Sequence, residues 1–320
     1  MKFIIKKTVD LTDKDWQDLQ KCFVEVYEKD RTLVEMKNQY MNTPMGGCIH
    51  SLCYDNDTIV AAHTAFPSYY WVGEKKIKVF ITGDTMVKKG YRDGSAYIDL
   101  ILGLNKYMKQ DGFVFSFGFP NENAYYVDKK GKIAKNIGRL NIYVLPYRIG
   151  GIKKGLSVLN PLSKCLCYMW VACGNLFSRR VLAQSLIHKD DVTYNMSRYK
   201  RMDADYNHVC VDGSEFYYKV KEQEGIRTAF LIDVIGKTEH SFYTAVKYII
   251  EKEKNSFDLL MYVGHLPKEV KKIGLLRVPR RFEPKHFYFT GKIIDKNQVT
   301  DDLIFDIRNW DVNLSDYDVI

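Results

Sequence analysis

The segment from Val87 to Ala96 has the composition of a phosphate-binding loop. A strand-like run, 81–87, leads into a turn with Gly90 and Gly94 and then into a predicted helix start. A helix N-terminus offers unpaired N–H groups and a positive dipole end, and small residues let the main chain approach a phosphate. Arg92 adds a planar guanidinium suited to phosphate oxygens. These residues predict a pyrophosphate cradle, although an ordinary surface turn would use the same glycines.

The elements that would position this loop alternate between helical and strand periodicity. Apolar spacing predicts helices over 13–28, 32–40, 95–109 and 121–130. Period-two patterns predict strands over 48–54, 58–66, 69–72, 77–87, 113–119 and 142–145. Pro67 is expected to end the second strand. Three or four antiparallel strands in a row should therefore precede the loop.

The spacing from Val87 to Arg92 is informative in itself, because four residues separate the end of the strand from the arginine. This arrangement resembles the Gcn5-related N-acetyltransferase (GNAT) superfamily, which has the acyl-CoA N-acyltransferase fold. After its arginine or glutamine the family has two glycine or alanine positions. Here those positions are Ser95 and Tyr97, and Gly94 stands one residue early.

A second segment carries the same resemblance. Asn121 and Ala124 match the Asn-x-x-Ala-x-x-x-Tyr pattern of many family members, whereas the tyrosine position is Asp128. In the family that tyrosine often protonates the leaving thiolate. Tyr126 is our choice to replace it, and packing of Tyr125 and Tyr126 against the sheet is the structural alternative.

The resemblance implies acetyl-CoA, or another acyl-CoA, as co-substrate and an amine of a small molecule or peptide as acceptor. The pantetheine would bond to the strand and the diphosphate would rest on the loop. The expected cofactor-binding residues are Met86, Val87, Tyr91, Arg92, Asp93, Gly94, Ser95, Ala96 and Asn121. Asp84 is the expected general base, with a strand-end hydrogen bond as its structural alternative.

The second half of the chain repeats the order of elements of the first half. A strand, a loop over 236–240, a helix and a second strand follow one another again, but this loop has no arginine or glycine pattern. We therefore expect an α/β (α+β) fold of two tandem acyl-CoA N-acyltransferase-like domains, each a mixed, mostly antiparallel sheet flanked by helices. The expected boundaries are 1–150 for the acyl-CoA-binding domain, 151–185 for a helical linker and 186–320 for a degenerate copy.

Residues 156–177 are apolar and have Lys153, Lys154, Arg179 and Arg180 at their two ends. A linker helix packed between the halves would explain the apolar residues. A surface helix that lies in a lipid interface would explain both the apolar residues and the basic ends, and would give peripheral membrane contact.

The composition fits a folded protein that contacts an anionic partner. Lys and Arg number 48 and Asp and Glu 39, so the formal charge is +9, which suits a phosphorylated cofactor or an anionic membrane surface. No nucleic-acid-binding motif accompanies this charge, so nucleic acid is not expected. The seven cysteines are odd in number and widely spaced, which favours reduced thiols and a cytoplasmic location. Cys165 and Cys167 have no paired Cys/His knuckle, so no metal is expected.

Three functions follow from these observations. The first is an N-acyltransferase that moves an acetyl or other acyl group from acyl-CoA to an amine by direct attack. The second is a non-catalytic protein of the same fold that binds a ligand or partner. The third is an aminoacyl transferase at the membrane surface, because tandem acyltransferase domains with one working site also resemble the Fem family.

Overall fold

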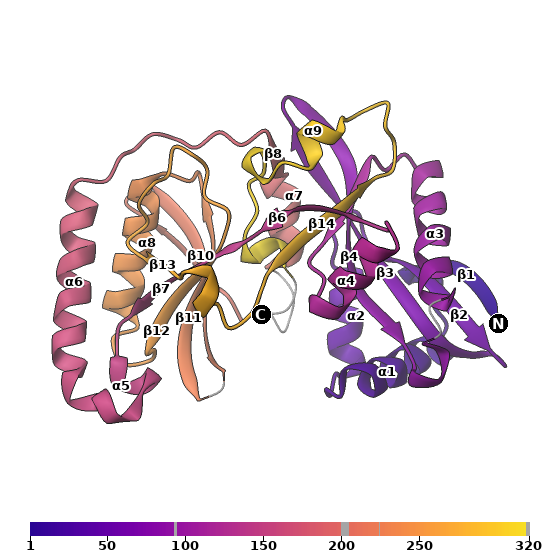
Figure 1. The fold of residues 1–320 in the computed structure, drawn as a ribbon, viewed down its shortest axis with the longest axis horizontal. Helices are drawn as coiled ribbons and strands as arrows, with labels where there is room; N and C mark the ends of the chain where they lie inside the picture. Colours follow the sequence, from indigo (N-terminus) through magenta and orange to yellow (C-terminus); the bar gives the residue numbers. More distant parts are fainter. Residues whose placement is uncertain (93–94, 200–204, 224, 318–320) are drawn as a thin grey trace. The chain divides into compact units, whose positions relative to one another are not determined.

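The computed structural model describes residues 1–92, 95–199, 205–223 and 225–317, and the chain forms two compact units (Figure 1). Unit 1 comprises Met1–Gly138, Leu186–Ala204 and Tyr288–Asn309. Unit 2 comprises Arg139–Ser185, Asp205–Phe287 and Trp310–Ile320. Both units contain a mixed sheet with helices against it, so the predicted mixed α/β fold is confirmed.

Unit 1 is built on a sheet in the order β1-β2-β3-β4-β5-β14-β6, with β8 pairing β3. Its strands are β1 (Lys2–Lys7), β2 (Ile49–Asp55), β3 (Thr58–Val72), β4 (Lys75–Val87), β5 (Phe115–Gly118), β6 (Lys135–Arg139), β8 (Ile187–Lys189) and β14 (Tyr288–Ile293). Its helices are α1 (Asp13–Tyr27), α2 (Leu33–Met41), α3 (Ser95–Gln110), α4 (Glu122–Lys130), α7 (Asp191–Arg198) and α9 (Asp301–Ile304). The predicted helices before and after the loop are confirmed.

The alternation of side chains along β3 separates two cores. Ala62 and Phe66 lie in the cluster formed with α1 and α2, whereas Ala61 and Ala65 lie in clusters formed with residues of α3. Successive side chains of a strand point to opposite faces, so these helices cover the two faces of one sheet. Thr12 and Thr32 start α1 and α2 with capping boxes, which satisfy first-turn N–H groups.

Pro67 does not end a strand, and this prediction was wrong. β3 continues through Pro67 to Val72, and Pro67 lies opposite Phe80 of β4. The carbonyl of Lys78 accepts a hydrogen bond from Val114 on the β5 side. By the alternation of an antiparallel ladder, the main-chain groups of Phe80 face β5 as well, and those of Pro67 face away from β4. The partner strand on that side, β2, has already ended at the pair Ile49–Ala65, so no ladder donor is missing.

Unit 2 contains a second sheet in the order β13-β7-β12-β11-β10-β9. Its strands are β7 (Asn141–Pro146), β9 (Asn207–Val211), β10 (Ser214–Gln223), β11 (Ile226–Ile235), β12 (Leu259–Gly264) and β13 (Leu276–Arg277). Its helices are α5 (Ile149–Ile152), α6 (Asn160–Leu176) and α8 (Glu239–Lys252). β11, α8 and the parallel strand β12 reproduce the predicted strand–loop–helix–strand order.

The division into units differs from the expected boundaries at 150 and 186 because strand pairing crosses them. β7 precedes residue 150 but pairs with β12 of unit 2. β14 comes late in the chain but pairs with β5 of unit 1. Each sheet is therefore completed by a strand that is distant in the sequence.

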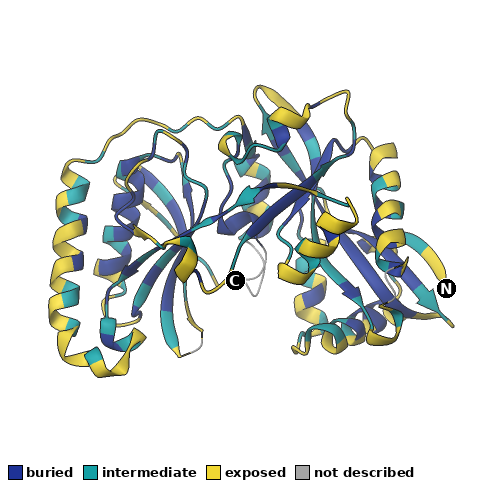
Figure 2. Cartoon of the chain, in the orientation of Figure 1, coloured by how far each residue is buried: buried dark blue, intermediate teal, exposed yellow. Residues whose placement is uncertain are grey.

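Helix α6 begins at Asn160 and has Pro161 in its first turn, where the missing N–H of proline would have no partner within the helix anyway. Only one side of α6 is buried, at Cys167 and Val171 in the core of unit 2 (Figure 2). Gly174 allows a close approach to α8, since a Cβ at this position would collide with the ring of Tyr243. The contact with α8 therefore fixes which face of α6 points outward.

Candidate functional site

The parallel strands β4 and β5 separate part-way along their length. They pair from Val79–Phe115 to Thr82–Gly118, after which β5 ends and β4 continues to Val87. At the last pair the strands are in close contact, because a Cβ on Gly118 would collide with the Thr82 side chain. In the described part of the chain no strand pairs with β4 on this side beyond Thr82. The main chain of β4 is therefore open to a ligand there.

A β-bulge lies in the open part of β4. Between the pairs Thr64–Gly83 and Ala62–Met86, β4 has one residue more than β3. Asp84 occupies the bulge with a φ of 41°, in the left-handed region. Bulges of this kind redirect main-chain N–H groups, so a carbonyl oxygen that approaches from the open side can meet donors that a regular ladder would use.

After the bulge, the main-chain groups of Val87 face the open side. Lys88 donates its N–H to the carbonyl of Val60 on β3. Because successive residues of an antiparallel strand face opposite neighbours, the N–H and C=O of Val87 face away from β3, and those of Met86 face β3. Of the two strand residues predicted to hold the pantetheine, Val87 thus has the better-placed main chain. An extended ligand can bond to such an edge as an added strand does.

The loop after β4 sends its two large side chains in different directions. Tyr91 donates its hydroxyl to Asp55 over 2.7 Å, and this hydrogen bond raises the pKa of Tyr91. Arg92 is exposed, and its Nε donates to the carbonyl of Val87 over 2.8 Å. The guanidinium therefore lies at the open end of β4, on the carbonyl that a strand-like ligand would use.

The predicted phosphate cradle is described only in part. Asp93 and Gly94 lie outside the described residues. α3 begins at Ser95, whose side chain is exposed, and Ala96 is fully buried. The predicted site residues Val87, Arg92, Ser95 and Ala96 are thus consecutive parts of one strand–loop–helix unit, which suits a phosphate at the helix N-terminus.

Asp84 is held by two donors on one oxygen. Its Oδ2 accepts from Nη1 of Arg31 over 2.8 Å and from the hydroxyl of Tyr40 over 2.8 Å. Burial, with the neighbouring carboxylate of Asp84, raises the pKa of Tyr40 far above its usual range, so this hydroxyl stays protonated and donates. These two hydrogen bonds hold the Asp84 carboxylate in place, and its role as general base stays a prediction.

A hydrogen-bonded pair of side chains, one of them buried, joins α3 to α4. Tyr97 donates its hydroxyl to Oδ1 of Asp128 over 2.6 Å, and Asp128 is 8% exposed. Burial raises the pKa of Asp128, although the hydrogen bond from Tyr97 opposes this shift. Burial also raises the pKa of Tyr97. The carboxyl at the tyrosine position of the family pattern thus has a tyrosine hydroxyl against it, supplied by another helix.

The comparisons with known proteins agree with this geometry. Residues 8–130 match the family model of the acetyltransferase (GNAT) domain. This region is a GNAT acetyltransferase domain. No curated protein matches the chain.

Solved structures share the fold along nearly the whole chain. A probable N-acyltransferase from Enterococcus faecalis V583 is 9% identical, with a TM-score of 0.59, over 92% of this chain and 73% of that one. A GCN5-related N-acetyltransferase from Anabaena variabilis is 10% identical, with a TM-score of 0.58, over 92% and 73%. One from Kribbella flavida is 10% identical, with a TM-score of 0.57, over 91% and 71%. At such low identity the likeness concerns the fold.

The remaining predicted residues of the GNAT domain lie on or before α4. Asn121 caps this helix, and its Oδ1 accepts from the N–H of Ala124 over 2.9 Å, so the matched motif has a structural role. Tyr126 is 56% exposed, with its ring edge against Tyr125. Tyr125 stacks on Tyr288 of β14 at 3.9 Å between ring centroids. The expected packing against the sheet therefore applies to Tyr125.

The Tyr97–Asp128 pair was not expected from the sequence, although the sequence contains a signal for it. Both residues depart from the family pattern, Tyr97 at a glycine position and Asp128 at the tyrosine position. Two departures that complement each other chemically predict a contact. Nothing in the local sequence connects the two residues, because they are 31 positions apart.

Two buried histidines support the strands beside the bulge. His63 contacts Oγ1 of Thr85, on the bulge, through Nδ1 at 2.7 Å, and burial lowers its pKa to about 4. His50 lies between the hydroxyls of Thr8 and Thr64, at 2.9 and 3.1 Å, and burial lowers its pKa to about 3. Both rings are neutral at pH 7, so they position the strands as hydrogen-bonding groups without charge.

These histidines predict an acid-sensitive fold. Their usual pKa is 6.5, so below this pH the unfolded chain binds protons that the folded one excludes. The free energy of unfolding should fall by up to about 1.4 kcal/mol per pH unit for each histidine as the pH drops from about 6.5 to 5. Urea denaturation across this range should show a smaller slope for His63→Gln than for the native protein. His208→Gln, at an exposed position, is the control, and an unchanged slope in His63→Gln would contradict the assignment.

Proposed function

We propose that the GNAT domain transfers an acyl group, most simply acetyl, from acyl-CoA to an amine of a small molecule or peptide. The opening between β4 and β5 beyond the Thr82–Gly118 pair is the observation that carries this proposal. It exposes a bulged main chain directly before Arg92 and the start of α3. An acyl-CoA needs this combination, because its pantetheine arm is amide-rich and its diphosphate is anionic.

The donor would bind by exchanging one hydrogen bond for several. Arg92 would leave the Val87 carbonyl and turn to the diphosphate, which α3 would face with its first-turn N–H groups. The pantetheine amides would then bond to the N–H and C=O of Val87. The diphosphate would rest on the loop from Tyr91 to Ala96, which includes Asp93 and Gly94. Asn121 is a further predicted cofactor contact.

Transfer would proceed by direct attack. The acceptor amine, as the free base, forms a bond to the thioester carbonyl carbon, and the carbonyl oxygen becomes an oxyanion that N–H groups near the bulge stabilise. The C–S bond then breaks, the electron pair leaves with sulfur, and the nitrogen loses its extra proton. Asp84, directly or through a water, is the proposed acceptor of that proton.

The leaving thiolate needs a proton, and two tyrosines are candidates for supplying it. Tyr126 was chosen from the sequence, and its exposed hydroxyl is accessible from solvent. Tyr97 is favoured by its contact with Asp128. Its hydroxyl would give a proton to the sulfur and take one from the neutral carboxyl of Asp128, a form that burial favours. We propose the Tyr97–Asp128 pair as the proton donor.

Binding without turnover is the second candidate function. Ser95 and Tyr97 at the family's glycine positions favour this second function. Side chains larger than glycine hinder a close approach of the main chain to the diphosphate. The cytoplasm, with its acyl-CoA pool, is the proposed location for either function.

Calorimetric titration with acetyl-CoA and with free CoA tests the binding step. We expect Arg92→Ala to weaken binding by about 1–3 kcal/mol, the range for loss of a charged hydrogen-bond partner. Arg308→Ala removes an exposed arginine elsewhere on unit 1 and should leave affinity unchanged. Absence of binding to the native protein at millimolar ligand would remove the acyl-CoA proposal altogether.

Release of CoA thiol from acetyl-CoA, with a panel of amines, tests the chemical step. We expect Tyr97→Phe to reduce turnover by about 10²-fold or more, with acetyl-CoA affinity retained, because only proton transfer is lost. Tyr126→Phe is the matched variant and should turn over normally. The opposite pattern would assign the donor role to Tyr126, and tight binding without thiol release for any amine would favour the binding function.

A further inference from the structure

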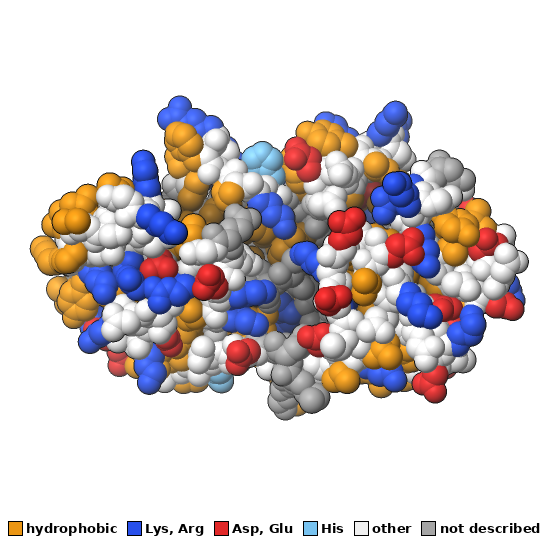
Figure 3. All heavy atoms as spheres, turned by 90° about the horizontal axis from the view of Figure 1, so that it is seen from below, with side chains coloured by type: hydrophobic (Ala, Val, Ile, Leu, Met, Phe, Trp, Pro, Cys, Tyr) orange, Lys and Arg blue, Asp and Glu red, His pale blue; other side chains and the backbone are white. Residues whose placement is uncertain are grey.

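Helix α6 of unit 2 presents an uncovered apolar face. Of the 27 large apolar side chains that are exposed among the described residues, 12 lie between Ile152 and Leu182. The outward-facing members on the helix are Leu162, Leu166, Met169, Trp170 and Leu176, which we call the α6 apolar face. Figure 2 shows the outer side of α6 exposed, and Figure 3 shows hydrophobic side chains gathered at the end of unit 2 where this helix lies. Monomeric proteins rarely expose so continuous an apolar surface without a partner.

This face cannot be buried by rotation of the helix. The opposite side of α6 is committed to the core through Cys167 and Val171. Gly174 fits against the ring of Tyr243 on α8 with no room for a side chain. The segment Lys154–Leu176 is long and apolar enough to cross a membrane by length and composition. However, a helix that packs on α8 along one side can offer only its other side to lipid, which fits a helix lying in an interface.

The charge around the helix selects the kind of partner. Residues 139–185 contain seven Lys or Arg and no Asp or Glu. Lys153 and Lys154 before the helix are exposed, as are Arg179 and Arg180 after it. A second copy of the chain would bring the same positive charge to this surface and repel it, whereas an anionic bilayer attracts basic groups while accepting apolar side chains.

We propose that the α6 apolar face docks on an anionic lipid bilayer, with the helix in the plane of the interface and Lys153, Lys154, Arg179 and Arg180 at the headgroups. Trp170 suits this position, because an indole has an apolar ring and one N–H donor that can remain at the polar boundary. The docking concerns unit 2 and does not depend on acyl transfer by the GNAT domain. An acceptor carried by lipid would be brought to the protein by the same contact.

Trp170 provides a direct probe, because it is the most exposed of the four tryptophans. Trp16 and Trp310 are buried and Trp71 is partly buried, whereas Trp170 is 52% exposed. Phosphatidylcholine vesicles containing phosphatidylglycerol should shift the emission of the full-length protein to shorter wavelength and sediment with it. Vesicles of phosphatidylcholine alone should bind much more weakly, and added salt should weaken the anionic binding. Trp170→Phe should keep sedimentation and lose the shift.

Matched variants separate the contribution of the basic residues to vesicle binding from that of the α6 apolar face. The doubly substituted protein Arg179→Glu, Arg180→Glu should bind anionic vesicles at least about tenfold more weakly, because each basic residue near the surface contributes about 1 kcal/mol. Leu166→Glu should weaken binding comparably, whereas Val34→Glu, at an exposed position of α2 in unit 1, should not. Failure of the native protein to bind anionic vesicles would overturn the proposal, and so would a dimer that Leu166→Glu disperses. Neither result would affect acetyl-CoA binding, which tests the proposed function separately.

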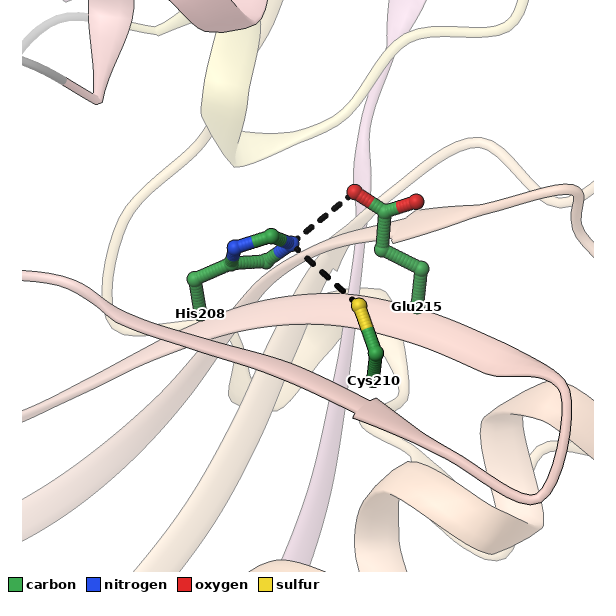
Figure 4. A group of neighbouring side chains, drawn as sticks. All are labelled: His208, Cys210 and Glu215. Atoms are coloured by element: carbon green, nitrogen blue, oxygen red, sulfur yellow. Dashed lines mark hydrogen bonds and ion pairs between the residues drawn. The ribbon is translucent and has the colours of Figure 1, made fainter.

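A second inference rests on the hairpin formed by β9 and β10. Cys210 lies opposite Glu215, and His208 lies opposite Tyr217, so these side chains share one face of the hairpin. Nε2 of His208 is 2.9 Å from Oε1 of Glu215 and 3.7 Å from Sγ of Cys210 (Figure 4). In the described part of the chain this is the one group of three or more His, Cys, Asp or Glu side chains that could hold a metal ion.

The hairpin holds these ligands in a suitable arrangement. Asp212 and Gly213 form a two-residue turn with φ values of 48° and 69°, as in a type I′ turn, which fixes the register of the strands. The His208 ring stacks on Tyr217 at 4.5 Å with an interplanar angle of 6°, which fixes the ring plane. The three ligand atoms all lie within 4.8 Å of one another. Zinc bonds of about 2.0–2.3 Å in a tetrahedral arrangement need ligand atoms about 3.4–3.6 Å apart, so small rotations of these side chains would complete the site.

The geometry points to a transition-metal site with one nitrogen, one sulfur and one oxygen ligand, of the kind that zinc occupies with water in the fourth position. Titration with Co²⁺ should produce sulfur-to-metal charge-transfer absorption in the near ultraviolet, and Zn²⁺ should displace it. Cys210→Ser and His208→Gln should abolish this absorption, whereas Cys173→Ser, at another exposed thiol, should retain it. No thiolate absorption in the native protein, or its persistence in Cys210→Ser, would overturn the site.

Discussion

The separation of β4 from β5 after the Thr82–Gly118 pair is the constraint on which the candidate site depends. A sheet normally pairs every main-chain group of an inner strand, so a strand with one open side has hydrogen-bonding capacity to offer. The close contact of Gly118 with Thr82 marks where pairing stops, and the bulge at Asp84 follows directly. Every predicted function of Val87 and Arg92 needs that open edge.

The surroundings of the open edge are held by buried polar contacts. Arg31 and Tyr40 fix Asp84 on one side, and His63 fixes Thr85 next to it. Such groups must be paired when buried, because an unpaired polar atom in a dry core is costly. The bulge is thereby kept in one conformation, which a binding site with preorganised donors requires.

Unit 2 carries an exposed apolar stripe on helix α6. Its sheet supports α8, and α8 in turn supports α6 through one buried stripe. The outward stripe of α6 has the same apolar character, but none of the described residues covers it. The fold that the chain shares with the two solved structures over 92% of its length thus carries a surface whose chemistry suits lipid.

The sequence by itself determined the elements and the position of the loop. Periodicity placed α1, α3 and β4, and the Val87–Arg92 spacing indicated the GNAT family, because local propensity and short motifs depend on neighbours in the chain. The sequence did not show which strands and side chains from distant parts of the chain would contact one another. Pro67 lies within a strand because β2 ends before it, and β14 joins β5 across a long separation. The contact of Tyr97 with Asp128 likewise arises only where two helices meet. Only the tertiary structure decided these features, since each depends on which groups remain unpaired after distant segments have come together.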